Sequence, residues 1–207
     1  MIKYLVENGY ADERVANAMK RVPRILFVPE IYKQHAYADS PLPISGGQTI
    51  SAPSIVALMT TQLDVKENMK VLEIGAGSGY QTAIIAELIG PNGIIYSVER
   101  IPELIELSKR NIESLGFKNV RIIYGDGTLG YKDGAPYDRI IVTAGAPQIP
   151  PPLLEQLKVN GKMIIPVGPM FWQDLLLIEK TEKNEIKETK LLPVMFVPLV
   201  GKYGYKE

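Results

Sequence analysis

The feature that most constrains the fold of this chain is an alternation of short apolar runs with helical patterns between residues 70 and 168. Five runs have the length and the branched apolar residues of buried strands: 70–74, 94–99, 120–126, 137–143 and 161–168. Helical patterns that begin at proline or end at glycine lie between them, at 80–90, 102–116 and 151–157. This alternation predicts a doubly wound α/β domain with a mostly parallel sheet.

The segments that flank this core have other patterns. Residues 12–22 form an amphipathic helical pattern that Asp12 can cap and Pro23 ends, and a second helical pattern runs from 54 to 63. The segment after residue 168 predicts two or three antiparallel strands at one edge of the sheet, around a charged turn at 183–185.

We therefore expect one domain with three parts. Residues 1–53 are expected to form a helical N-terminal extension with a substrate and cofactor loop, and residues 54–168 the cofactor-binding core. Residues 169–207 are expected to form the antiparallel edge strands and a C-terminal tail.

Composition excludes several kinds of site. The chain has no cysteine and one histidine, His35, so disulfides and thiol nucleophiles are excluded, and no metal site is expected. The 23 basic and 23 acidic residues balance, which argues against a nucleic-acid partner. The sequence contains no run of 18 apolar residues and its first residues do not resemble a signal peptide. We expect a cytoplasmic protein with no membrane partner.

A glycine-rich loop follows the first predicted strand. The stretch VLEIGAGSGY (71–80) has glycine at 75, 77 and 79, and glycine lets a backbone turn tightly and approach a ligand closely. The helix that follows offers unpaired N–H groups. Tyr80 departs from the dinucleotide pattern, which would need glycine or alanine there. The spacing is instead G-x-G-x-G, with Glu73 two residues before the first glycine.

Carboxylates at two other strand ends extend this candidate site. Glu99 ends the second strand, where a carboxylate can accept two hydrogen bonds from a ribose diol. Asp126 follows the third strand, where it can accept from an adenine amino group while Gly127 lets the ring lie against the backbone. Each feature alone is also explained by a turn or a solvated strand end. Together, at the carboxyl ends of parallel strands, they predict a nucleoside-type cofactor.

An acid-x-G-x-G-x-G loop followed by an acid on the second strand resembles the S-adenosylmethionine-dependent methyltransferases. The resemblance implies a Rossmann-like methyltransferase sheet, S-adenosyl-L-methionine as cofactor and S-adenosyl-L-homocysteine as product. It places the loop around the methionine part of the cofactor: Glu73, Gly75, Ala76, Gly77, Ser78 and Gly79. It places a second set around the ribose and adenine: Glu99, Arg100, Gly125, Asp126 and Gly127.

A longer block is more specific. AYADSPLPISGGQTISAP (36–53) resembles the signature of the protein-L-isoaspartate (D-aspartate) O-methyltransferases. Further matches include RILFVP (24–29), GDGTLG (125–130), APYDRIIVTAGAPQIP (135–150) and FVPL (196–199). The family implies methyl transfer to the free α-carboxylate of L-isoaspartyl residues in damaged proteins, with D-aspartyl residues as an alternative acceptor. The ester then closes to a succinimide, which leads back to normal aspartate.

The resemblance also implies roles for individual residues. The family's active-site serine falls on Ser51, and Gln48, Thr49, Ile50 and Ser51 lie in the segment that lines the cofactor. Thr49, Ser51 and Val197 correspond to contacts with the substrate. Two positions depart from the family pattern: Ser54 stands where many members have histidine, and Val200 where some have threonine.

The chemistry of a carboxylate acceptor suits this residue set. A carboxylate is ionised at pH 7, so it needs no general base to attack a sulfonium methyl. The hydroxyl of Ser51 can donate to one carboxylate oxygen without neutralising the nucleophile as a lysine or arginine would.

Other interpretations remain open at this point. Ser51 and Thr49 can be N-caps of the helix at 54, His35 a surface residue and Trp172 a packing residue. A nucleic-acid methyltransferase commonly has a [DN]-P-P-[FY] motif after the fourth strand, which TAGAPQIPPP lacks. A cofactor-binding module without activity is the third alternative.

Overall fold

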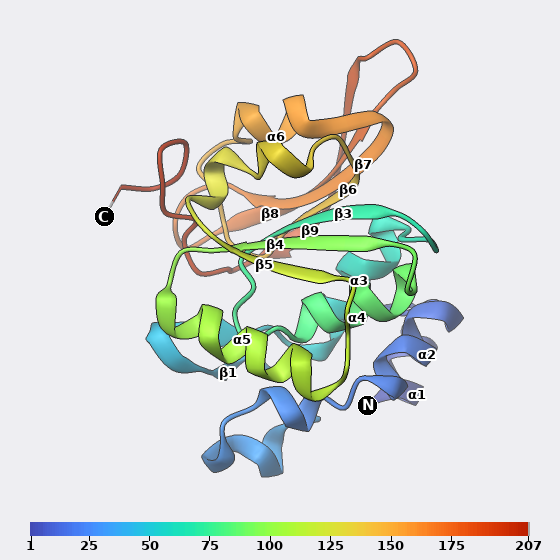
Figure 1. The fold of residues 1–207 in the computed structure, drawn as a ribbon, viewed down its shortest axis with the longest axis vertical. Helices are drawn as coiled ribbons and strands as arrows, with labels where there is room; N and C mark the ends of the chain where they lie inside the picture. The colour runs from blue at the N-terminus through green and yellow to red at the C-terminus, as the bar shows by residue number, and fades with distance from the viewer. Residues whose placement is uncertain (207) are drawn as a thin grey trace.

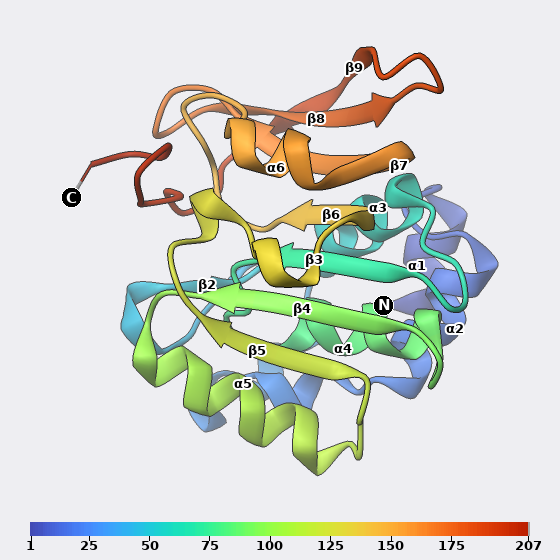
Figure 2. The same cartoon turned by 45° about the horizontal axis from the view of Figure 1, so that its top comes forward.

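The computed structural model describes residues 1–206, and its centre is a seven-stranded sheet with the order β5-β4-β3-β6-β7-β8-β9 (Figures 1 and 2). Five strands of this sheet are parallel: β3 (Lys70–Ile74), β4 (Ile94–Glu99), β5 (Val120–Tyr124), β6 (Tyr137–Val142) and β7 (Leu157–Val167). The hairpin of β8 (Gln173–Lys180) and β9 (Ile186–Val194) is antiparallel at one edge. The predicted mostly parallel sheet with antiparallel edge strands is confirmed.

Helices cover both faces of this sheet. On one face lie α3 (Pro53–Leu63), α4 (Tyr80–Ile89) and α5 (Pro102–Ser114), and on the other lies α6 (Pro151–Gln156) (Figure 1). Successive strand residues point to opposite faces. Val71 of β3 therefore packs in one core with α3 and α4, while its neighbour Leu72 packs in a second core with Leu153 of α6.

The N-terminal segment packs below α3 and α4. It begins with α1 (Ile2–Glu7) and α2 (Glu13–Arg21), and Asp12 accepts a hydrogen bond from the backbone N–H of Val15 at 2.8 Å, as the predicted cap requires. The sequence did not predict α1. The chain then forms short elements: η1 (Arg24–Phe27), η2 (Glu30–His35), β1 (Leu42–Pro43), η3 (Ser45–Gly47) and β2 (Thr49–Ile50).

Strand β7 is longer than the sequence predicts. It begins at Leu157 rather than 161, because Asn160 adopts a left-handed backbone with φ of 61° and the pairing with β6 shifts register there. A bulge of this kind lets one strand continue across an interruption of its ladder.

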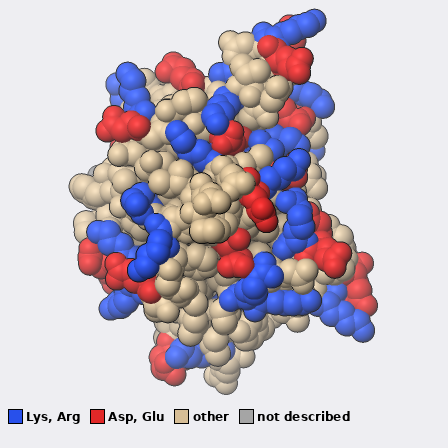
Figure 3. All heavy atoms as spheres, turned by 45° about the vertical axis from the view of Figure 1, so that its right-hand side comes forward, with Lys and Arg blue, Asp and Glu red and all other residues tan. Residues whose placement is uncertain are grey.

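Charged residues are interspersed on the surface that Figure 3 shows, where acidic and basic side chains lie beside one another. Close ion pairs include Lys158 with Asp138 and Lys190 with Asp174, each at 2.7 Å. The balanced charge of the chain is therefore not divided into a basic and an acidic half on this face. Within residues 1–206, no helix has both the length and the apolar character that a membrane crossing requires.

Candidate active site

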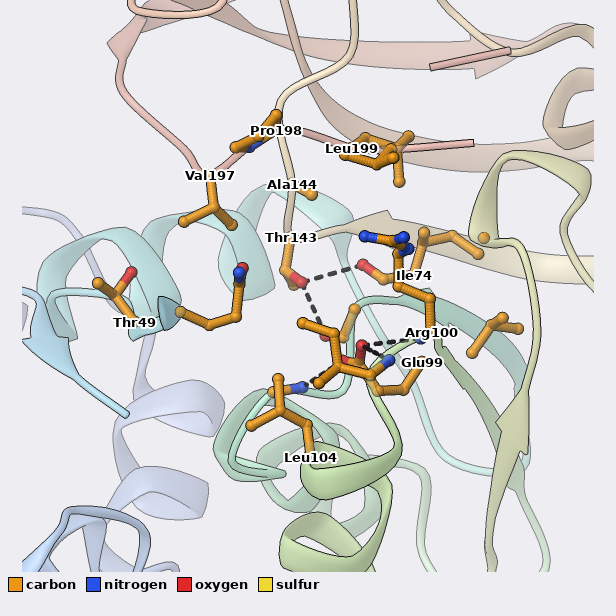
Figure 4. A pocket seen from close by; sticks show the side chains of 17 residues that line it. Thr49, Ile74, Glu99, Arg100, Leu104, Thr143, Ala144, Val197, Pro198 and Leu199 are labelled. Carbon is orange, nitrogen blue, oxygen red and sulfur yellow. Dashed lines mark hydrogen bonds between the residues drawn. The ribbon is translucent and has the colours of Figure 1, made fainter. Parts of the chain in front are cut away.

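The glycine-rich loop leaves β3 in a left-handed backbone conformation. Gly75, Gly77 and Gly79 have φ values of 94°, 54° and 87°, which residues with a side chain rarely adopt. A Cβ atom on Gly75 would lie 2.4 Å from Oγ1 of Thr143, at the end of β6. That hydroxyl donates to the backbone oxygens of Ile74 and Gly75, at 2.9 and 2.7 Å (Figure 4). The loop is thus held against the end of β6, and only glycine fits at position 75.

The Glu99 carboxylate, at the end of β4, accepts hydrogen bonds from the loop after β3 and from the residues after β4. Its Oε2 accepts a hydrogen bond from the N–H of Gly77 at 3.0 Å, and its Oε1 accepts from the N–H groups of Arg100 and Ile101 at 2.8 and 3.0 Å. A carboxylate has about four acceptor positions, so three backbone bonds leave room for one more donor. Glu99 therefore has room for one ribose hydroxyl, whereas the predicted two hydrogen bonds from a ribose diol would need one of these backbone bonds to break.

A main cavity of about 120 Å³ lies between this loop and the segment after β9 (Figure 4). It is lined by eight of the predicted site residues: Gln48, Thr49, Gly75, Gly77, Glu99, Arg100, Gly127 and Val197. It is also lined by residues for which the sequence predicted no role: Ile74, Val98, Ile101, Leu104, Thr143, Ala144, Pro198 and Leu199. Val200, noted only as a departure from the family pattern, completes the wall.

A second cavity of about 50 Å³ adjoins the main cavity and is lined by Ser51. The two cavities share Thr49, Gly75, Gly77 and Thr143. The remaining walls of the second cavity are Ile50, Val56, Met59, Ala76, Ser78, Tyr80, Gln81 and Phe196. This Ser51 cavity has no charged side chain among the described residues that line it.

Ser51 does not cap the helix that follows it. Helix α3 begins at Pro53 with Ala52 as its N-cap, and the side chain that accepts from its first turn belongs to Asp39, which accepts from the N–H of Ser54 at 2.8 Å. The interpretation of Ser51 as a helix cap is therefore wrong. His35 is exposed, as expected of a surface residue. Trp172 is 64% exposed, so the expectation that it packs in the interior is wrong.

Asp126 lies in a third hollow beside the main cavity, together with Gly125 and Arg100. Its Oδ1 accepts from the N–H of Thr128 at 2.8 Å, and its Oδ2 accepts from the N–H of Lys202 at 2.8 Å. The C-terminal tail (residues 201–206) thus contacts the strand end that was predicted to bind adenine. The sequence did not predict this contact, because the tail contributes only a backbone N–H to it.

Two predicted residues lie behind the cavities rather than in their walls. Gly79 is the N-cap of α4, and Glu73 is fully buried on β3. The Oε2 of Glu73 accepts from the hydroxyls of Thr82 and Ser97, the latter at 2.6 Å, while its Oε1 has no partner among the described residues. Burial raises the pKa of Glu73 to about 8, so the carboxyl is mostly protonated at neutral pH. Glu73 supports the glycine-rich loop from inside the fold.

Thr143 and Phe196 are the wall residues that sequence reasoning missed most clearly. Both lie in stretches that were noticed, the TAGAP that follows the fourth strand and the FVPL after β9. Thr143 stands at the carboxyl end of a parallel strand, which is the signal that could have identified it.

The residues present fit S-adenosylmethionine. Gly127 lines the main cavity, and a Cβ there would lie 2.4 Å from Cγ2 of Ile74, so only glycine lets these two walls of the cavity pack together. Glu99 offers an acceptor beside the apolar side chains of Ile101 and Leu104. Within residues 1–206, no three His, Cys, Asp or Glu side chains gather as a metal ion requires.

Comparison with known proteins identifies the family. The model of the protein-L-isoaspartate(D-aspartate) O-methyltransferases matches residues 1–204. A protein of Methanothrix thermoacetophila named protein-L-isoaspartate O-methyltransferase is 57% identical over 199 residues, which cover 96% of this chain and 93% of that protein.

Two solved structures agree with this match. One, named protein-L-isoaspartate O-methyltransferase, has a TM-score of 0.89 and 32% identity over 98% of this chain, which spans 66% of the length of that one. The other, a Plasmodium falciparum β-aspartate methyltransferase in complex with S-adenosyl-L-homocysteine, has a TM-score of 0.85 and 32% identity over 96% of each chain. The predicted family, enzyme class and cofactor are confirmed. The chain belongs to the protein-L-isoaspartate(D-aspartate) O-methyltransferase family, whose enzymes depend on S-adenosylmethionine.

Proposed function

We propose that this chain transfers the methyl group of S-adenosylmethionine to the free α-carboxylate of L-isoaspartyl residues in damaged proteins, with D-aspartyl residues as an alternative acceptor. The acceptor carboxylate occupies the Ser51 cavity. The observation that carries this assignment is the chemistry of that cavity, which offers hydroxyl and amide donors but no charged side chain among its described walls.

A neutral donor set suits an anionic nucleophile. The acceptor carboxylate is ionised at pH 7 and needs no base, so the protein's task is to orient it. The hydroxyl of Ser51 donates to the carboxylate oxygen that does not react, and Thr49 and Gln81 lie in the same wall. A lysine or arginine in their place would hold the carboxylate more tightly but would reduce its nucleophilicity.

The main cavity holds the cofactor in this proposal. When bound, S-adenosylmethionine supplies an electrophilic methyl group on a sulfonium centre. The loop from Gly75 to Gly79 contacts its methionine part, Glu99 and Arg100 lie at the ribose, and Asp126 with Gly127 lies at the adenine. Thr49 belongs to both cavities, so it borders cofactor and acceptor at once.

The remaining parts of the chain serve the same site. Val197 borders the main cavity and contacts the backbone of the substrate peptide. Residues 1–53 supply the substrate loop, residues 54–168 the cofactor core, and residues 169–207 the edge strands, all in one functional domain. We place this repair activity in the cytoplasm, in keeping with a chain that has no cysteine.

The test is a pair of substitutions at Ser51. Ser51→Ala removes the proposed donor, and kcat for an isoaspartyl peptide should fall by about 10²-fold or more, the usual effect of losing one oriented donor. Binding of S-adenosylmethionine should change less than about threefold, and Ser51→Thr, which keeps a hydroxyl, should retain more activity than Ser51→Ala. An unchanged kcat for Ser51→Ala would overturn the proposed role of Ser51.

A further inference from the structure

Four large apolar side chains are exposed close together at one end of the sheet. Met170, Phe171 and Trp172 are 40%, 77% and 64% exposed, and Met195 is 76% exposed. We call these four residues the apolar rim. Trp172 is the one tryptophan of the chain, and bulky apolar side chains that remain in water together often mark a binding surface.

The strands bring the four residues to the same place. Met170, Phe171 and Trp172 lie in the connection between β7 and β8, and Met195 directly follows β9. Gln173 of β8 pairs with Val194 of β9, so the next residues outward, Trp172 and Met195, extend the same pair of strands. Because β7 is parallel to β3, the connection between β7 and β8 begins at the carboxyl ends of the parallel strands. The glycine-rich loop lies at the same end of the sheet (Figure 2).

One buried glutamine joins the apolar rim to the walls of the active site. Gln173 is fully buried, and its Nε2 donates to the backbone oxygens of Pro169 and Met170, each at 2.8 Å. Its Oε1 accepts from the N–H of Phe196 at 2.8 Å. Phe196 lines the Ser51 cavity and the next residue, Val197, lines the main cavity. The rim is therefore continuous with the segment after β9, which lines both cavities.

We propose that the apolar rim binds bulky apolar side chains of the substrate protein that lie near its isoaspartyl residue. The inference rests on the proposed function and adds the substrate class: unfolded or flexible segments in which the damaged residue has large apolar neighbours. A peptide in an extended form advances about 3.3 Å per residue, and Met195 directly precedes Phe196, which lines the Ser51 cavity, so this end of the rim adjoins the cavity wall.

The size of the rim favours a peptide over a second copy of the chain. Four partly exposed side chains offer on the order of 500 Å² of apolar surface, whereas a stable dimer buries about 800 Å² on each partner. A surface of this size accommodates two or three side chains of an extended segment.

Two isoaspartyl peptides that differ only in the residues beside the isoaspartate test the proposal, one with leucine and phenylalanine and one with serine and threonine. The wild-type chain should methylate the apolar peptide with a kcat/KM about tenfold higher. In the double variant Phe171→Ser/Trp172→Ser this ratio should fall to about one, through a loss of kcat/KM for the apolar peptide. Ile31→Ser is the matched control, because Ile31 is 74% exposed on η2, and it should keep the wild-type ratio.

Two outcomes would overturn the inference while the proposed function stands: an unchanged ratio in the double variant, whether or not both kcat/KM values fall, or a change from dimer to monomer on gel filtration. The last would mean that a second copy covers the rim. If the wild-type chain methylates neither isoaspartyl peptide, the proposed function itself fails.

Discussion

The carboxylate Oδ1 of Asp39 accepts a hydrogen bond from the backbone N–H of Ser54 at 2.8 Å, and this bond closes the segment between them into a loop. Thr49 and Ser51, which border the cavities, lie inside that loop. The buried Arg24 holds the chain just before it, because its Nε donates to the backbone oxygen of Ala36 at 2.8 Å. The donor in the bond to Asp39 is the backbone N–H of Ser54, so this bond does not depend on the side chain at position 54.

Replacement of Asp39 should therefore displace Ser51 while the Ser51 side chain itself is unchanged. We expect Asp39→Ala to lower kcat about tenfold and to lower the free energy of unfolding by about 1 kcal/mol, the usual worth of one hydrogen bond. Asp39→Asn keeps an oxygen acceptor and should lie closer to wild type in both assays. Steady-state kinetics with an isoaspartyl peptide and urea unfolding measure the two effects. Full kcat in Asp39→Ala would show that the loop does not depend on this bond.

Gly75→Ala tests the contact between the glycine-rich loop and β6. The new Cβ would lie 2.4 Å from Oγ1 of Thr143, and the backbone at φ of 94° resists any side chain. We expect the affinity for S-adenosylmethionine to fall by more than about tenfold in isothermal titration, because the loop must shift. Gly116→Ala is the control, since Gly116 has φ of 76° but no atom within 4 Å of the new Cβ. It should lose about 1 kcal/mol of stability and keep its affinity. If Gly75→Ala and Gly116→Ala bind S-adenosylmethionine equally tightly, the close approach of the loop to Thr143 is not needed for cofactor binding.

Gly201→Ala tests the contact of the C-terminal tail with Asp126. A Cβ on Gly201 would lie 2.0 Å from Oδ1 of Asp126, so the tail or the carboxylate must move. Because Asp126 is proposed to contact the adenine, the Kd of S-adenosylmethionine should rise about tenfold while the KM of the peptide changes little. Lys202→Ala, a substitution in the same tail that keeps the backbone N–H bonded to Asp126, is expected to leave the Kd near that of wild type. If the Kd of Gly201→Ala equals that of the control, the contact between the tail and Asp126 does not affect cofactor binding.

Glu73→Gln tests the buried carboxyl through pH. The pKa of Glu73 in the folded state is raised by burial to about 8, above the ordinary value of 4.5, so the folded state binds the extra proton between these two values. The stability due to this proton is complete below about pH 4.5 and is lost as pH rises toward 8, with a slope of up to about 1.4 kcal/mol per pH unit. Glutamine cannot ionise, so the free energy of unfolding of Glu73→Gln should vary less across this range.

Urea unfolding at several values between pH 5 and 8 compares these profiles. Glu182→Gln, at an exposed residue of the β8–β9 turn, should follow the wild-type profile. Parallel profiles for wild type and Glu73→Gln would mean that the buried carboxyl does not titrate in this range.

The order of elements could be predicted because its signals are local. Strand β3 and strand β4 begin and end where the sequence predicts, since each is a short apolar run followed by a loop. Helix α5 begins at Pro102, as expected, and ends near Gly116. The glycine-rich loop was predictable for the same reason, because a left-handed backbone restricts the choice of residue.

The features that escaped prediction depend on contacts between distant segments. The tail reaches Asp126 through the backbone N–H of Lys202, and every residue type except proline offers that group. Burial of Glu73 depends on hydroxyls from α4 and β4, which the linear sequence does not place together. Trp172 was expected to be a packing residue between the fifth strand and the edge strands, but it is exposed and its neighbour Gln173 is buried instead.

The most direct test of the account is methyl transfer from labelled S-adenosylmethionine to two matched peptides, one with isoaspartate and one with normal aspartate at the same position. The account predicts base-labile label on the isoaspartyl peptide alone, since only that residue presents a free α-carboxylate to the Ser51 cavity. Label on both peptides, or on neither while the cofactor binds, would contradict it.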